Sequence, residues 1–138
     1  MSEPSSPPPY DSRFVKGVEF FNECEFFEAH EVWEELWTEV QGPKRKFFQG
    51  MIQLAVCLHH FGNGNLRGAR KLYHSCRGYL EDYLPQCYGI DLEKLLYELH
   101  ACCQGILESD ELATDINIDP DLIPDIELDP PPENQLSC

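Results

Sequence analysis

Three side chains of this sequence could hold a metal ion, namely His30, Glu34 and His60. His30 and Glu34 are four residues apart, which places them on one face of a helix. Imidazole and carboxylate groups are ligands of divalent transition metals, and two histidines with one carboxylate leave coordination positions open for water. The set therefore predicts a divalent metal ion that polarises a bound water molecule. His59 is a less favoured third ligand.

The same residues also allow interpretations without a metal. Gln49, Gln53 and His60 fall within about 40° of one another around a helix, and Trp37 follows Glu34 by three residues. Amide, imidazole and carboxylate groups that are buried together could satisfy one another's hydrogen bonds and fix the register of two helices. Acid–base chemistry without a metal is a third interpretation. The residues alone leave these alternatives open.

Familiar catalytic spacings are absent from the sequence. The stretch His30-Glu-Val-Trp-Glu34 has a glutamate where a zincin carries its second histidine, and no Glu-x-x-His pair points to a di-metal site. The glycines of Gly62-Asn-Gly64 follow a predicted helix and do not form a phosphate loop. No Ser or Cys lies in a nucleophile motif. Whether the protein is an enzyme is therefore left open.

The elements that must position these residues are helices. The expected class is all-α, a compact bundle of about five helices arranged as hairpins, with extended tails at both ends. The breaks come from Gly42-Pro43, from Gly62-Asn63-Gly64 and from the residue before Pro85. The predicted helices are Ser12 to Asn22, Phe26 to Val40, Pro43 to Phe61, one capped by Asn65 that ends near Leu84, and one capped by Asp91.

The helix from Pro43 to Phe61 is apolar on nearly all sides, which is typical of a central helix. The face of the preceding helix that carries His30 and Glu34 is aromatic, so we expect it to be buried as well; its aromatic members are Phe26, Phe27, Trp33 and Trp37. Since burial of unpartnered polar groups costs several kcal/mol, the simplest packing lays the two polar stripes against each other.

An internal similarity relates the helices in pairs. A shift of 40 residues places Phe26 on Leu66 and Trp33 on Tyr73. The pattern resembles tetratricopeptide-type hairpins, but two hairpins fall short of the three that a solenoid needs, so a closed bundle is predicted. Hairpins of this kind suggest an alternative function, a non-catalytic adaptor that binds a peptide or a small ligand.

Composition divides the chain into a Pro/Ser-rich tail over 1–11, a helical domain over 12–108 and an acidic tail over 109–138. The net charge is −15, with nine acidic and no basic residues from Ser109 onward, and this charge disfavours nucleic acid as a partner. No apolar run reaches the roughly 20 residues of a membrane span, and the odd number of cysteines points to free thiols. We therefore expect a cytoplasmic protein.

The acidic tail also carries apolar residues at regular intervals: Ile116, Ile118, Leu122, Ile123, Ile126 and Leu128. It is too rich in proline for regular structure, so we expect it to lie extended along the helical body. Its charge predicts weak docking near Arg67, Arg70 and Lys71 that salt would loosen. Oligomeric state is not predicted.

Several motifs together resemble a known family. These are Phe26-Phe-Glu-Ala-His-Glu-Val-Trp-Glu-Glu-Leu-Trp37, Phe48-Gln-Gly-Met-Ile-Gln-Leu-Ala55, His59-His60 and Gly64-Asn-Leu-Arg-Gly-Ala69. The resemblance is to domain-of-unknown-function family 309, small helical proteins with an H-x-x-x-E-x-x-[W/Y] motif that His30, Glu34 and Trp37 fill here. It spans roughly Gly17 to Leu107 and implies a helical fold and a His/Glu metal site without an assigned reaction.

Overall fold

The computed structural model describes residues 10–109 and 115–132. Residues 1–9 of the predicted N-terminal tail and residues 110–114 and 133–138 of the acidic tail lie outside the described residues. The five helices are α1 (Ser12–Asn22), α2 (Phe26–Trp37), α3 (Arg45–Gly62), α4 (Leu66–Leu80) and α5 (Leu92–Glu108). This arrangement confirms the predicted all-α class. Within the described residues, no helix is long and apolar enough to cross a membrane.

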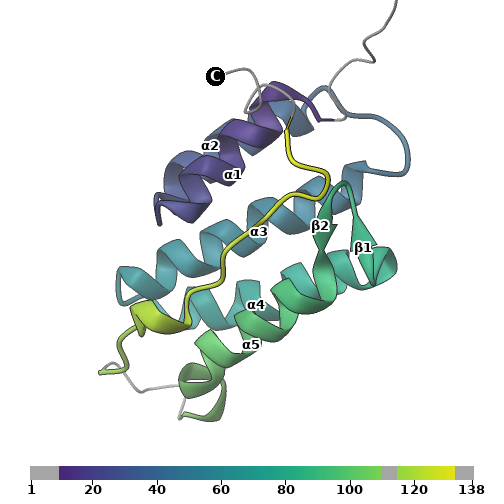
Figure 1. Cartoon of the computed structure of the whole chain (residues 1–138). Helices are drawn as coiled ribbons and strands as arrows, with labels where there is room; N and C mark the ends of the chain where they lie inside the picture. Colours follow the sequence, from purple (N-terminus) through teal and green to yellow (C-terminus); the bar gives the residue numbers. More distant parts are fainter. Residues whose placement is uncertain (1–9, 110–114, 133–138) are drawn as a thin grey trace, which may run out of the picture.

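Successive helices pack against one another, with α3 between the α1/α2 pair and the α4/α5 pair (Figure 1). Polar side chains at helix starts set several boundaries. Asp11, Asn65 and Asp91 cap α1, α4 and α5, and their side chains accept hydrogen bonds from the backbone N–H groups of Arg13, Gly68 and Lys94. All three caps lie at or next to the helix starts that the sequence predicts.

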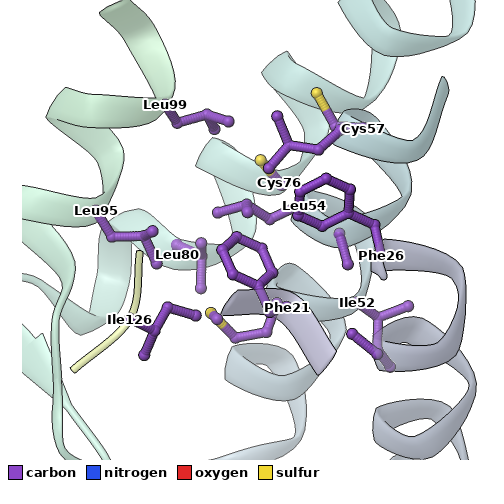
Figure 2. Close-up of a cluster of buried hydrophobic side chains, with 14 of the residues drawn as sticks. Phe21, Phe26, Ile52, Leu54, Cys57, Cys76, Leu80, Leu95, Leu99 and Ile126 are labelled. Atoms are coloured by element: carbon purple, nitrogen blue, oxygen red, sulfur yellow. The ribbon is translucent and has the colours of Figure 1, made fainter. Parts of the chain in front are cut away.

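The core follows α3 along its length, as its apolar character predicts. Ten residues of α3 are buried, and the aromatic side chains of α1 and α2 pack around Phe14 and Trp33. Gly17 lets α1 approach the indole of Trp33, because a Cβ atom at this position would lie 2.0 Å from Trp33 Nε1. Figure 2 shows Phe21 of α1 and Leu95 of α5 in one cluster of buried side chains.

Several boundaries differ from the predicted ones. Helix α2 ends at Trp37 and α3 begins at Arg45, whose guanidinium donates to the carbonyls of Trp37 and Val40 and so satisfies the end of α2. Helix α4 gives way to a 3₁₀ turn, Glu81–Tyr83. A short antiparallel hairpin follows, formed by β1 (Gln86–Cys87) and β2 (Ile90–Asp91). Strands of two residues show no alternating pattern, so the sequence does not predict them.

The C-terminal segment, which we define as residues 115–132, lies between α1 and α5 (Figure 1). It is extended apart from a single 3₁₀ turn, Pro120–Leu122, so the expectation that it contains no regular structure is wrong at that turn. The expected location near Arg67, Arg70 and Lys71 is wrong for residues 125–132, which lie beside α1 and α5. At the start of the predicted tail, Arg70 donates to the carbonyl of Ile106 and to the hydroxyl of Ser109. Ile126 and Leu128 of the segment are buried and pack against the apolar core.

Candidate functional site

His30 lies in the middle of α2 with a defined tautomer. Its Nδ1 is 3.1 Å from the carbonyl oxygen of Phe27, one turn earlier. Since a carbonyl only accepts hydrogen bonds, Nδ1 carries the proton and Nε2 keeps its lone pair in the neutral ring. Nε2 is 3.9 Å from Oε2 of Glu34, too far for a hydrogen bond. The two strongest candidate ligands therefore face each other without bonding directly.

The expected burial of this pair is wrong. The side chain of His30 is 19% exposed and that of Glu34 is 57% exposed, and no polar residue among those described falls in the buried class. Residues advance by 100° in a helix, so Glu34 lies about 120° from the centre of the face that α2 buries. That face consists of Phe26, Ala29, Trp33 and Leu36. The pair thus lies at the edge of the α2 contact surface.

Two contacts fix how α2 lies on α3. The rings of Phe27 and His59 are 5.4 Å apart near the start of α2, and the guanidinium of Arg45 is 4.0 Å from the Trp37 ring at its end. The helices therefore run antiparallel, and His30 is level with about residue 55 of α3 while Glu34 is level with about residue 49. The two polar stripes do not pack against each other as predicted, because Gln49 donates to Tyr79 of α4 and His60 lies beside Asn65 at the start of α4.

His60 does not join the pair. In the antiparallel register it is level with the loop that precedes α2, and its Nδ1 is 3.3 Å from Nδ2 of Asn65. Burial and the neighbouring His59 lower the pKa of His60. Among residues 10–109 and 115–132, no three His, Cys, Asp or Glu side chains are grouped so that they could share a metal ion. The metal interpretation of His30, Glu34 and His60 stays a prediction.

The glutamine and tryptophan residues of the stripe have different environments. Gln49 Nε2 donates to the hydroxyl of Tyr79 on α4, 3.1 Å away. Gln53 Oε1 and Trp37 Nε1 are buried and have no hydrogen-bond partner in the described part of the chain. The predicted network of mutually satisfied side chains is therefore not complete. Each buried polar atom without a partner costs about 1–3 kcal/mol.

An aromatic side chain that we expected to be buried is exposed at this site. Phe27 is 44% exposed, and its ring lies 5.3 Å from that of His30 and 5.4 Å from that of His59. It stands about 140° from the centre of the buried face of α2, which explains the exposure. The exposed side of α2 also has an acidic hollow, which is lined by Glu31, Val32, Glu34, Glu35 and Thr38.

Together these observations define a helical protein with a partly exposed His/Glu pair. The model of a family described as "Domain of unknown function (DUF309)" matches residues 14–72, from α1 into α4. Over this stretch the chain is similar to that family, which confirms the resemblance drawn from its motifs.

The chain is also similar to an uncharacterised protein of Bacillus subtilis (strain 168), YpuF. The two are 46% identical over 56 residues, which make up 40% of this chain and 32% of that protein. The chain thus covers about a third of the length of this curated relative. The family and the relative carry no assigned activity, so function must be argued from the site.

Proposed function

We propose that His30 and Glu34 bind a divalent transition-metal ion, and that the chain is a metal-binding helical domain. A single observation carries the proposal. The proton of His30 is directed to the Phe27 carbonyl, which leaves the Nε2 lone pair facing a carboxylate oxygen 3.9 Å away. A hydrogen bond from the second ring nitrogen to a backbone carbonyl is the arrangement that orients histidine ligands in metal sites.

The separation of the two ligand atoms fits one ion. Metal bonds to imidazole nitrogen and carboxylate oxygen are about 2.1 Å long, so two ligand atoms of a tetrahedral ion are about 3.4 Å apart. The distance between Nε2 and Oε2 is 3.9 Å, and a small movement of the exposed Glu34 side chain would bring the two atoms to this separation. The carboxylates of Glu31 and Glu35 beside Glu34 add negative charge that favours a cation.

The site would be open. With two side-chain ligands, the other positions of the ion belong to water, and a metal-bound water is more acidic than free water. His30 and Glu34 would hold and orient the ion, and the proposal assigns no reaction to it.

Thermal melts in chelator and then in Zn²⁺ or Mn²⁺ test the proposal. A ligand that binds only the native state raises the melting temperature by mass action. Wild type should respond to an ion, and Glu34→Gln and His30→Ala should lose the response. His60→Ala should keep it, because His60 is outside the register of the pair. Glu31→Gln is the matched control for lost charge. Equal shifts in all five proteins would refute a site made by this pair.

A second candidate function is that of a non-catalytic adaptor that binds a peptide. It is favoured by a different observation, namely that the space between α1 and α5 already holds an extended chain segment. The segment is bound through backbone hydrogen bonds, the mode by which peptide-binding proteins hold extended ligands. This function does not depend on the metal.

A further inference from the structure

The surface between α1 and α5, which we call the α1–α5 groove, holds residues 124–130 as an extended segment in which buried and exposed side chains alternate. Pro124, Ile126 and Leu128 are buried, whereas the acidic residues between and after them are exposed. Figure 2 shows Ile126 in the same cluster as Phe21 of α1 and Leu95 of α5. The groove therefore takes every second side chain, as a site for an extended peptide does.

Backbone contacts hold the segment in register. The side chain of Asn22 forms two hydrogen bonds with Ile126: its Nδ2 donates to the carbonyl and its Oδ1 accepts from the N–H, each at 2.8 Å. The N–H of Asp129 donates to the carbonyl of Gly89, at 3.0 Å. The hydroxyl of Tyr10 donates to the carbonyl of Pro130, at 2.6 Å. None of these contacts requires the segment to belong to the same chain.

An open pocket lies beside the segment. It has a volume of about 500 Å³ and is lined on one side by Val15, Val18, Glu19 and Asn22 and on the other by residues 126–129, Pro131 and Pro132. Val15 and Val18 are already buried, so the pocket offers room beside the segment and little uncovered apolar surface. A competing extended segment has space here for a larger side chain than the chain's own segment provides.

We propose that the α1–α5 groove is a recognition site for an extended segment of another protein with the pattern Pro-acid-Ile-acid-Leu-acid-Pro, and that residues 124–130 compete with it in cis. This proposal names the partner chemistry of the adaptor function and rests on that function. The buried positions give affinity, and the Asn22 side chain fixes register. The exposed acidic positions keep the segment soluble and place charge beside Lys94 of α5.

The test uses the full chain and a fluorescent peptide with the sequence of residues 116–131. Wild type should bind it weakly, because a tethered segment competes at an effective concentration in the millimolar range. In the double variant Ile126→Asp/Leu128→Asp the tethered segment is disabled, and binding should strengthen at least tenfold. Adding Asn22→Ala to that variant should weaken binding about tenfold, since both backbone hydrogen bonds to the peptide are lost.

Circular dichroism and a thermal melt establish that each variant is folded. If the aspartates prevent folding, Ile126→Ala/Leu128→Ala disables the segment more gently and takes their place. All titrations are made in chelator, so the metal proposal is unaffected by their outcome. A scrambled peptide of the same composition is the control for charge. Equal binding of both peptides would overturn the proposed pattern and leave the adaptor function, whereas no binding to either disabled variant would overturn both.

Discussion

Gly17→Ala should destabilise the protein, although alanine is the better helix former. A Cβ atom at residue 17 would lie 2.0 Å from Nε1 and 2.4 Å from Cδ1 of Trp33, whose side chain is fully buried. To reach ordinary contact the indole would have to retreat by more than 1 Å. That shift breaks the hydrogen bond from Trp33 Nε1 to the carbonyl of Phe14, which is 3.1 Å long.

The opposing contributions can be compared. Overpacking a core costs typically 1–3 kcal/mol, and a buried donor left without a partner costs about 1–3 kcal/mol more. Replacing glycine by alanine within a helix stabilises the folded state by about 1 kcal/mol. The net loss is therefore roughly 1–5 kcal/mol, or a fall in melting temperature of about 3–20 °C for a chain of this size.

Thermal and urea unfolding followed by circular dichroism measure this loss. Gly78→Ala is the matched control, because Gly78 lies in α4 and a Cβ there would meet nothing within 4 Å. It should gain about 0.5–1 kcal/mol from helix propensity alone. If Gly17→Ala were as stable as wild type, the close approach of α1 to Trp33 would not exist and the proposed packing of α1 on α2 would be wrong.

Two further results are expected. Burial lowers the pKa of His60, so the imidazole binds a proton more readily in the unfolded chain, and the free energy of unfolding should fall as pH drops below about 6.5. His60→Gln should show a smaller fall in melting temperature between pH 7.5 and 5.5 than wild type. An unchanged fall would contradict the lowered pKa of His60. Alkylation followed by mass spectrometry should label the exposed Cys24 before the buried Cys76. Burial raises the pKa of the Cys76 thiol to about 12, which leaves little of the reactive thiolate. Equally fast labelling of both residues would show that the core opens.

Helix positions could be predicted because their signals are local. Caps such as Asp91 and breakers such as Gly62-Asn63-Gly64 act within one turn of the chain. Periodicity also predicted that the two polar stripes pack against each other, which is wrong because the stripe of α3 faces α4, where Gln49 donates to Tyr79. The two-residue strands at Gln86 and Ile90 gave no such signal.

Burial of the site could not be predicted from α2 alone. The sequence shows an aromatic helix, but which aromatic residues face the core depends on two neighbours, α1 and α3, that contact α2 from different sides. Trp33 is buried by α1, and this rotates Phe27 and Glu34 toward the surface. The position of the C-terminal segment was missed for a related reason. Charge suggested the basic face of α4, whereas the groove beside α1 offers apolar surface for Ile126.

The hydrogen bond between Tyr10 and Pro130 brings distant parts of the sequence to one corner of the molecule. Gly89 of the hairpin lies at the same corner, where a Cβ atom would be 2.1 Å from the Tyr10 hydroxyl. The first and the last part of the described chain, near residues 10 and 130, are thus in contact. A circular permutant that joins residues 10 and 130 through a short linker and opens at the exposed Gly64 turn should fold. Residues 10 and 130 thus lie side by side, so a short linker suffices to join them.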